Sequence, residues 1–267
     1  MQPTLAIALL AAALVGTSLA DGTCNTVTFK QCTQAAFGDY LGLNDTNAIA
    51  NLFTDYTILD NFLLGQWAKT DGVDTIIKTC NALSQFYQCM QGNEFCVSLE
   101  GILKANDGAD IESVYAVRGV LVEYDFKCGA GLGTLLRGDI SCVQNAVSKS
   151  YDALRDCTKT YVSNVRHDAG RACTHANVLS LCYSAPFHLA QCKHPSSQEA
   201  TMDTWWACVS QKKFVLEHFP TCLSEIRCVE RPFGLNAFLD EHHVARSDGS
   251  HDLTMPAHYE LINGMPT

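Results

Sequence analysis

Apolar residues recur every three or four positions through most of the chain, which is the spacing of one face of an α-helix. Strand-like alternation of apolar and polar residues is scarce. The pattern therefore predicts an all-α fold. Runs with helical spacing cover residues 29–40, 49–67, 73–90, 110–127, 141–162, 172–184 and 198–217.

Two of these runs begin with capping residues. Asp45 or Thr46 can cap the run over 49–67, because a side-chain oxygen at this position accepts hydrogen bonds from the first backbone amides of a helix. Ser196 and Glu199 have the spacing of a capping box at the start of the last run. Both signals agree with the helical periodicity.

Residues 1–20, MQPTLAIALLAAALVGTSLA, form an uncharged apolar run with small residues at its last and third-last positions. This pattern predicts a signal peptide that is cleaved before Asp21. The run is short of the roughly 20 apolar residues that span a bilayer, and no later run approaches that length. We therefore expect a secreted, soluble, extracellular protein without a membrane span.

The chain has 14 cysteines, and all of them follow the predicted signal peptide. An even number of cysteines in a secreted chain predicts a fully oxidised disulfide framework. No Cys-x-x-Cys pair occurs, which argues against a zinc site or a redox-active dithiol. The predicted disulfide cysteines are Cys24, Cys32, Cys80, Cys89, Cys96, Cys128, Cys142, Cys157, Cys173, Cys182, Cys192, Cys208, Cys222 and Cys228.

Helix geometry limits which cysteines can pair. Cys80 and Cys89 are nine residues apart, so on one helix they face opposite sides and lie roughly 13 Å apart along the axis. A disulfide requires Cα atoms within about 7 Å. The same argument applies to Cys173 and Cys182. Each helix should therefore be linked to different neighbours, which predicts a helical bundle cross-linked by disulfides, with a connectivity that the sequence leaves open.

The cysteine spacing suggests two related halves. The Cys-x8-Cys pattern of Cys80 and Cys89 recurs 93 residues later, and Cys128 and Cys222 are 94 residues apart. Chance spacing and an internal duplication both fit these distances. The corresponding division is a helical cysteine-rich half over 21–140, a second half over 141–229, and a flexible C-terminal tail over 230–267. Whether the halves form one domain or two stays open.

The glycines of KCGAGLGTLL, at positions 129, 131 and 133, do not have the Gly-x-Gly-x-x-Gly spacing of a dinucleotide-binding loop. The preceding residues have helical rather than strand periodicity, so the loop lacks the required βαβ context. We expect a structural hinge at a helix end that uses positive φ angles of glycine. No cofactor is expected.

Histidines are the remaining candidates for chemistry. His242, His243, His251 and His258 lie among acidic residues in the tail, where we expect at most weak, nonspecific metal binding and no dedicated metal site. His175 is expected to be a partly exposed structural residue. No Gly-x-Ser-x-Gly motif is present, so the sequence indicates no catalytic residues and we expect a non-enzymatic protein.

Net charge and surface residues limit the classes of partner that the protein could bind. The formal net charge of −10, from 18 basic and 28 acidic residues, disfavours nucleic acid and anionic membranes as partners. Trp205 and Trp206 are adjacent, so we expect one ring in the core and the other against a loop. Asn44-Asp45-Thr46 is an N-glycosylation sequon in a predicted loop, which makes Asn44 the candidate glycosylation site.

The segments FYQCMQGNEFC and YDFKCGAGLGTLLRGDISC, together with the signal peptide and helical periodicity, resemble the nematode families of secreted cysteine-rich helical domains of unknown function. This resemblance covers roughly residues 24–228 and implies an extracellular helical module without assigned catalytic residues. The Cys-x8-Cys pattern is also similar to that of helical odorant-binding carriers, although their Cys-x3-Cys pattern is missing here.

These observations favour an extracellular interaction module as the function. The first alternative is a carrier of a small apolar ligand or lipid, because disulfide-linked helices can hold a cavity. A secreted hydrolase is the second alternative, because catalytic residues can converge in space without a sequence motif. A broad exposed apolar patch would favour the interaction module, and a deep apolar pocket would favour the carrier.

Overall fold

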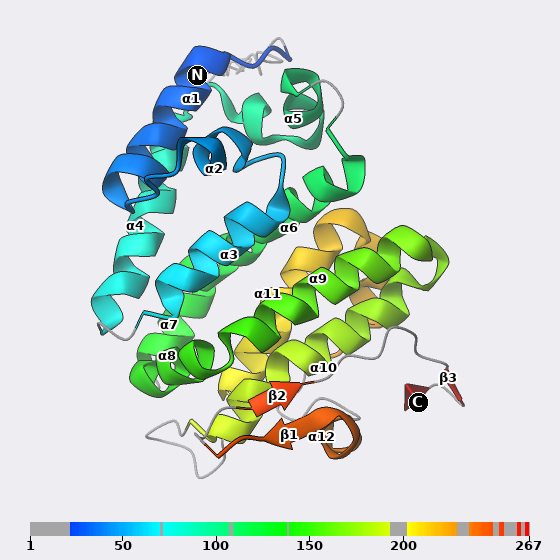
Figure 1. The fold of residues 1–267 in the computed structure, drawn as a ribbon. Coiled ribbons are helices and arrows are strands. Elements are labelled where there is room, and N and C mark those ends of the chain that lie inside the picture. The colour runs from blue at the N-terminus through cyan, green and yellow to red at the C-terminus, as the bar shows by residue number, and fades with distance from the viewer. Residues whose placement is uncertain are drawn as a thin grey trace, which may run out of the picture.

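The computed structural model is almost entirely helical within the part of the chain that it describes, as the periodicity predicts (Figure 1). The only strands there are two short hairpins near the C-terminus. No described helix is long and apolar enough to cross a membrane. The described residues are 22–69, 72–106, 109–137, 139–192, 202–228, 235–247, 251–253, 261–262 and 265–266.

The described residues of the first part of the chain, up to Cys128, form six α-helices and two helical segments of other types. One of these segments, η1, is a π-helix that continues directly from α1. The elements are α1 (Thr26–Thr33), η1 (Gln34–Tyr40), α2 (Thr46–Asn51), α3 (Tyr56–Trp67), α4 (Val73–Cys89), η2 (Glu94–Val97), α5 (Leu99–Ala105) and α6 (Ile111–Cys128).

The second part is also helical, and its long helices α9, α10 and α11 lie side by side (Figure 1). The elements are α7 (Ala130–Arg137), α8 (Ile140–Lys149), α9 (Tyr151–His167), η3 (Ala169–Arg171), α10 (Ala172–Ala190), α11 (Met202–His218), η4 (Pro220–Ser224), α12 (Leu235–His242), β1 (His243–Ala245), β2 (His251–Leu253), β3 (Leu261–Ile262) and β4 (Met265–Pro266). Strands β1 and β2 pair antiparallel, as do β3 and β4.

The two parts share one hydrophobic core, which has its most extensive helix packing between α6 and α11. The two backbones approach closely at Gly119. A Cβ atom there would lie 2.7 Å from the Phe214 ring and 2.8 Å from the Phe214 carbonyl oxygen. Glycine is therefore required at this crossing, because any side chain would force the two helices apart.

All fourteen cysteines form disulfides, and no free cysteine remains. Cys80 and Cys89 bridge to different elements, as their geometry on one helix predicts, and so do Cys173 and Cys182. No bridge joins a cysteine up to 128 to one from 142 onward. The pairs are Cys24–Cys96, Cys32–Cys89, Cys80–Cys128, Cys142–Cys192, Cys157–Cys182, Cys173–Cys222 and Cys208–Cys228.

Several predicted boundaries differ from the structure. The run over 141–162 is two helices, because the chain leaves helical geometry at Ser150 between α8 and α9. The buried positions before and after Ser150 keep the three- and four-residue spacing of one continuous helix face, so the apolar periodicity could not reveal this break. The run over 172–184 continues to Ala190, since Pro186 is accommodated inside α10 and the helix ends at Gln191 with φ of 50°.

The predicted N-cap residues can be compared with the observed helix starts. Asp45, rather than Thr46, is the N-cap of α2, and its carboxylate accepts hydrogen bonds from the amides of Asn47 and Ala48. The run over 49–67 is divided because Asp55 caps a separate helix, α3. The proposed capping box of Ser196 and Glu199 lies outside the described residues.

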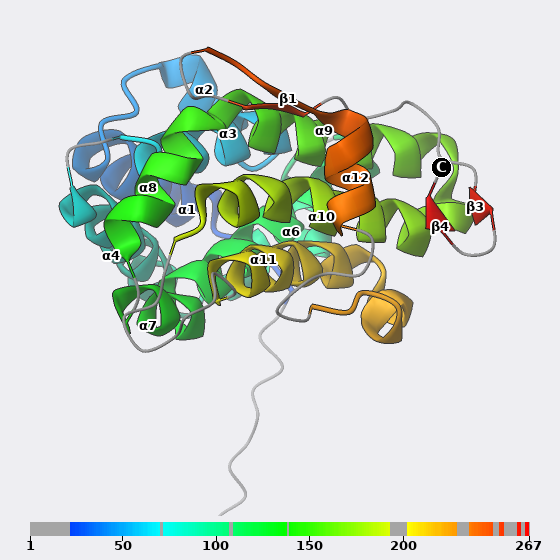
Figure 2. The same ribbon diagram turned by 90° about the horizontal axis from the view of Figure 1, so that it is seen from below.

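The C-terminal segment is not a wholly flexible tail, contrary to our expectation. Helix α12 packs against α10 (Figure 2). Its residues Leu235, Phe238 and Leu239 are buried. These apolar residues are spaced by three and four positions, which is helical spacing. The many polar residues around them made this short helical pattern hard to recognise in the sequence. Strand β1 follows α12 directly and pairs with β2.

The glycine stretch joins α6 to α7, so it is a junction between helices. Gly129 ends α6 with φ of −99°, which is not the positive φ that we expected. Close contacts instead account for Gly129 and Gly131, but not for Gly133. A Cβ atom on Gly129 would lie 2.8 Å from the Asp125 carbonyl oxygen, and one on Gly131 would lie 2.8 Å from the Trp206 indole nitrogen. The hinge position is confirmed and its proposed physical reason is wrong.

Candidate functional site

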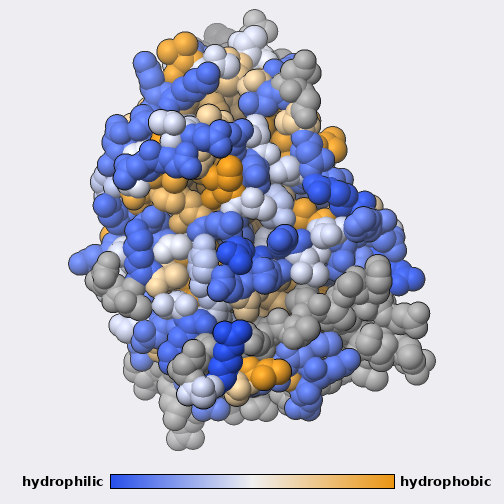
Figure 3. Space-filling view, viewed as in Figure 1, coloured by the Kyte–Doolittle hydropathy of each residue, from blue (hydrophilic) through white to orange (hydrophobic). Residues whose placement is uncertain are grey.

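A groove of about 850 Å³ lies between the α1–η1 segment and α2, and Ala105 and Asn106 at the end of α5 also line it. On the face drawn in Figure 3, apolar and hydrophilic side chains alternate in the upper part of the molecule, where these helices lie. The lining residues are Thr26, Phe29, Lys30, Gln31, Thr33, Gln34, Ala35, Asp39, Thr46, Ile49, Ala50, Phe53, Thr54, Ala105 and Asn106.

Two helical stripes face one another across this groove. Each stripe has spacing i, i+3, i+4 and i+7, which is the spacing of one side of a helix. The last member of the second stripe, Phe53, lies in the turn that follows α2. The caps Asn25 and Asp45 fix the starts of the two helices through hydrogen bonds to backbone amides. The α1 stripe is Thr26, Phe29, Lys30 and Thr33, and the second stripe is Thr46, Ile49, Ala50 and Phe53.

The floor of the groove is aromatic. The ring centroids of Phe29 and Phe53 are 5.0 Å apart, and both rings pack near Phe86 of α4. Phe53 is 3% exposed, whereas Phe29 is only partly buried. The floor is therefore firmly held by the core, while its upper surface offers apolar contact area to a bound molecule.

One wall is the π-helix η1. Its wider turn lets Gln34 Nε2 donate a hydrogen bond to Asp39 Oδ1 at 2.8 Å, across five residues. A side chain at Gly38 would collide with the amide group of Gln34, so glycine makes room for this bond. π-Helical turns are rare and frequently occur at functional sites. The wall thus presents polar groups above the apolar floor.

The rim contains an exposed cation, Lys30. Asp39, the acidic residue of the lining, accepts the hydrogen bond from Gln34. Among the described residues, no carboxylate lies within ion-pair distance of the Lys30 ammonium group. The groove therefore combines an apolar floor with a positive charge that is available to an anionic group of a ligand.

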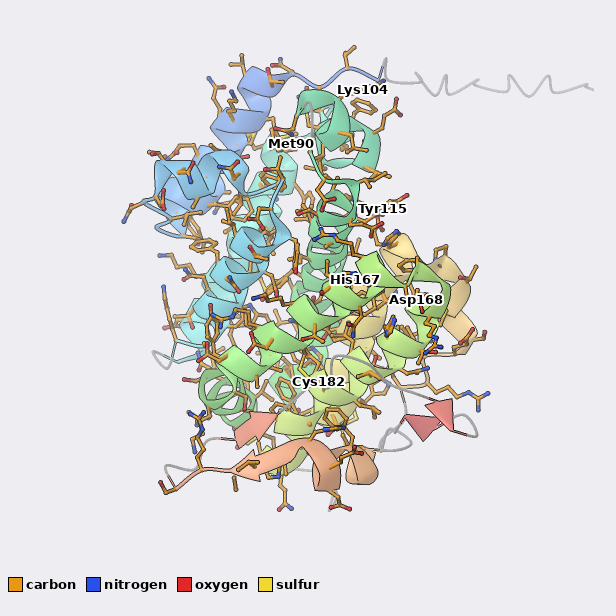
Figure 4. The ribbon with its side chains drawn as sticks, turned by 45° about the vertical axis from the view of Figure 1, so that its right-hand side comes forward. Met90, Lys104, Tyr115, His167, Asp168 and Cys182 are labelled. Atoms are coloured by element: carbon orange, nitrogen blue, oxygen red, sulfur yellow. A yellow bond between two sulfur atoms is a disulfide. The ribbon has the colours of Figure 1, made fainter. Side chains whose placement is uncertain are left out.

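A second, much smaller cavity of about 10 Å³ lies where α6 begins and α11 ends. His218 Nδ1 lies 3.5 Å from Glu112 Oε2, and the imidazole stacks on the Tyr115 ring at 3.9 Å between ring centroids. Tyr115 lies on α6 (Figure 4). Burial lowers the pKa of His218 below its usual 6.5, although the Glu112 carboxylate opposes this change. The imidazole is thus neutral at pH 7.

This cavity has no catalytic arrangement. Its described lining includes no serine, threonine or cysteine that could act as a nucleophile. The volume accommodates about one water molecule, which is far too small for a substrate. The hydroxyl of Tyr161 is buried beside it without a protein hydrogen-bond partner, so a water bridging to this hydroxyl is the natural content of the cavity.

A buried polar cluster lies deeper, between α3, α6, α10 and α11. Lys127 Nζ lies 2.5 Å from Glu123 Oε1 and donates a hydrogen bond to the Tyr183 hydroxyl at 2.9 Å. Asp60 of α3 belongs to the same cluster, where burial raises the pKa of its carboxyl group to about 7 and the Glu123 charge adds to this shift. Four rings surround the Lys127 ammonium group at 4.5–5.8 Å, namely Trp67, Tyr124, Tyr183 and Trp206.

The cluster stabilises the ammonium group by an ion pair, a hydrogen bond and cation–π contacts. Neither the groove nor the small cavity is lined by residues of this cluster, and the Lys127 and Glu123 side chains are 2% and 1% exposed. Its position at the junction of four helices makes it part of the packing that holds the two parts of the chain together, rather than a ligand site.

The residues singled out from the sequence are not brought together. Asn44 is exposed in the loop before α2, two residues from Thr46 of the groove lining. Trp206 is 1% exposed in the core and Trp205 packs against Phe126, so the expected division of the two rings is confirmed, although the outer ring contacts a helix and not a loop. His175 is 8% exposed and thus buried, contrary to our expectation.

Metal binding has no structural support in the described residues, which contain no group of three or more His, Cys, Asp or Glu side chains arranged around a possible ion. His243 lies in β1 opposite Leu253 of β2, and His258 lies outside the described residues. The sequence did not reveal the groove, because Phe29, Ile49 and Phe53 have the spacing of ordinary core residues. Their polar stripe neighbours, Lys30 and Thr46, were the signal that these faces are not fully covered.

Comparisons with known proteins add no relative. No protein-family model, no curated protein and no solved structure matches this chain.

Proposed function

We propose that this protein is an extracellular interaction module that binds a segment of a partner protein in the groove between α1 and α2. The observation that supports this proposal is the pair of stripes that line the groove, in which Thr26, Lys30 and Ala50 are exposed. Apolar grooves between helices are a recurring site for partner segments. The seven disulfides and the predicted signal peptide support an extracellular setting.

The shape of the groove favours a protein segment over an enclosed small molecule. Small-ligand sites usually bury 70–90% or more of their ligand. This groove is open along α1 and α2, where Thr26, Lys30 and Ala50 are exposed. A carrier of an apolar ligand is the second candidate, because a volume of about 850 Å³ lies within the usual range for small-molecule sites.

Site-specific photo-cross-linking tests the proposal. A photoreactive phenylalanine analogue replaces Ala50 in the groove or Lys149 on the exposed face of α8, and each protein is incubated with extracellular fluid of the source organism. We expect a discrete cross-linked protein from position 50 only. The same product should disappear when Ile49→Asp is added and persist with Ile58→Asp, a control on α3 with similar partial burial outside the lining.

Cross-linking that is equal at positions 50 and 149, or that survives Ile49→Asp, would contradict the proposal. A small molecule that co-purifies with the native protein and depends on Ile49 would instead support the carrier.

A further inference from the structure

Two parts of the chain have the same disulfide connectivity. Numbered within the first part, the six cysteines from Cys24 to Cys128 pair first to fifth, second to fourth, and third to sixth. The cysteines at 142, 157, 173, 182, 192 and 222 pair in the same order. The bridge Cys208–Cys228 is an addition to this second set. The shared order supports an internal duplication, and we call the two parts repeat 1 and repeat 2.

The contacts between α6 and α11 follow the same relation. Arg118 Nε of α6 donates to Glu217 Oε1 of α11 at 3.0 Å. Gln211 Nε2 of α11 donates to Glu123 Oε1 of α6 at 2.8 Å. Arg118 and Gln211 are 93 residues apart (211 − 118), and the two glutamates are 94 apart (217 − 123), the same spacings as the repeated cysteines. Reciprocal contacts of this kind are expected when equivalent helices meet at an approximate two-fold axis.

The second cysteine of each repeat aligns α1 with α9. The sequence Phe-Lys-Gln-Cys-Thr at 29–33 corresponds to Leu-Arg-Asp-Cys-Thr at 154–158. The two threonines are buried and make equivalent hydrogen bonds. Thr33 Oγ1 donates to the Phe29 carbonyl oxygen at 2.8 Å, and Thr158 Oγ1 donates to the Leu154 carbonyl oxygen at 3.5 Å. The groove stripe on α1 therefore has an equivalent stripe on α9, which is Tyr151, Leu154, Arg155 and Thr158.

The stripe on α9 is covered by protein. The Tyr151 hydroxyl donates a hydrogen bond to the Asn61 carbonyl oxygen of α3 at 3.1 Å, and Leu154 is fully buried. On α1, the equivalent Thr26 is exposed and Phe29 is only partly buried. Repeat 1 has 32 more residues than repeat 2 between its second and third cysteines (47 against 15), and this interval contains both α2 and α3. Helix α3 thus packs against repeat 2, while α2 borders the open stripe of repeat 1.

The charges differ between the two stripes. Arg155 pairs with Asp152 at 3.2 Å and with Asp156 at 3.7 Å on its own helix. The positions equivalent to these aspartates on α1 are Val27 and Gln31, so Lys30 lacks the carboxylates that its equivalent has. Val27 is also 64% exposed. The α1 stripe therefore carries an apolar surface and the positive charge of Lys30, unpaired among the described residues, whereas two carboxylates neutralise the equivalent charge of Arg155 on α9.

We infer that the groove is the open equivalent of the helix-covered face of α9, and that the partner segment it binds is an amphipathic α-helix with an acidic side chain opposite Lys30. This inference rests on the proposed function and specifies the chemistry of the bound segment. Apolar residues at i, i+3 or i+4, and i+7 of that helix would contact Phe29, Ile49 and Phe53. Its carboxylate would pair with the Lys30 ammonium group at the rim.

Selection of peptides from a random 16-residue display library against the full-length, disulfide-bonded protein tests this inference. Binders are counterselected on the Ile49→Asp variant, so that groove-dependent peptides are retained. We expect peptides with helical apolar spacing and at least one Asp or Glu, and at least about tenfold weaker binding to Ile49→Asp. Lys30→Gln should weaken binding by about two- to fivefold, as a single exposed ion pair does, and Lys149→Gln should leave it unchanged.

The outcomes separate the two proposals. Groove-dependent peptides without helical spacing, or peptides that bind equally to the wild type and Lys30→Gln, would overturn the helical, acidic segment and leave the groove as the binding site. A selection that yields no peptide, or only peptides insensitive to Ile49→Asp, would overturn the groove as a protein-binding site and the inference with it. Replacing the peptide's acidic residue by its amide should cost as much affinity as Lys30→Gln.

Discussion

Lys127 and Glu123 form an ion pair in the interior, with their side chains 2% and 1% exposed. The pair is one helical turn apart on α6, and Gln211 of α11 also donates to the glutamate. Buried ions are tolerated only when their partners are present, because removal of one partner leaves an uncompensated charge in a medium of low dielectric constant. The cluster therefore couples α6 to the second part of the chain.

Replacing Lys127 by methionine should lower the free energy of unfolding by about 3–5 kcal/mol, because the buried Glu123 would lose the ammonium group that compensates it. The double variant Lys127→Met with Glu123→Gln should be less destabilised than the single variant. Chemical denaturation followed by circular dichroism measures both. A single variant as stable as the wild type would contradict the charge argument.

Asp60→Asn should change how stability depends on pH. Burial raises the pKa of Asp60 to about 7, against a value of 3.8 without this environment. The carboxyl group faces Glu123, Lys127 and the tyrosines at 124, 151 and 183. Between pH 4 and pH 7 the unfolded state is ionised while the folded state holds the proton. Raising the pH through this window therefore lowers stability, and the loss is complete above pH 7.

We expect Asp60→Asn to reduce this loss by about 2–4 kcal/mol between pH 4 and pH 7, since the amide does not ionise. Denaturation midpoints at a series of pH values measure the effect. Parallel curves for the wild type and the variant would show that Asp60 ionises normally in the folded protein.

Gly119→Ala and Gly133→Ala should act in opposite directions. At Gly119 a methyl group would meet the ring and backbone of Phe214, so we expect a loss of about 1–3 kcal/mol. At Gly133 of α7 a methyl group meets nothing within 4 Å, so alanine should stabilise the helix by about 0.5–1 kcal/mol. Thermal unfolding of the two variants compares them directly. Similar effects at both positions would contradict the close crossing of α6 and α11.

Glycosylation of Asn44 is expected when the protein is secreted from eukaryotic cells, because the side chain is exposed in a loop. Enzymatic removal of N-glycans should reduce the mass, and Asn44→Gln should give the reduced mass without treatment. An unchanged mass after enzyme treatment would mean that the sequon is unoccupied.

The sequence predicted the helical class and the disulfide chemistry well, because both depend on local spacing. Cys80 and Cys89 are nine positions apart, which on one helix already excluded a bridge between them. The break at Ser150 was missed because the apolar phase continues through it. The predicted run over 172–184 was too short, since Pro186 lies inside α10 and the helix continues to Ala190.

The groove could not be predicted because it depends on two helices that meet in space. Phe29 and Ile49 have the spacing of core residues, and only the fold shows that their stripes face each other without a covering element. Lys127 was missed for a related reason. A lysine at a helix end usually lies in solvent, and only the packing of four helices encloses this one.

Hydrogen–deuterium exchange of the full-length protein with and without a groove-selected peptide tests the central claim most directly. We predict slower exchange in the peptide-bound state at residues 26–34 and 46–53, with little change in α8 and α12. Protection confined to other elements, with α1 and α2 unchanged, would contradict the assignment of the groove as the binding surface.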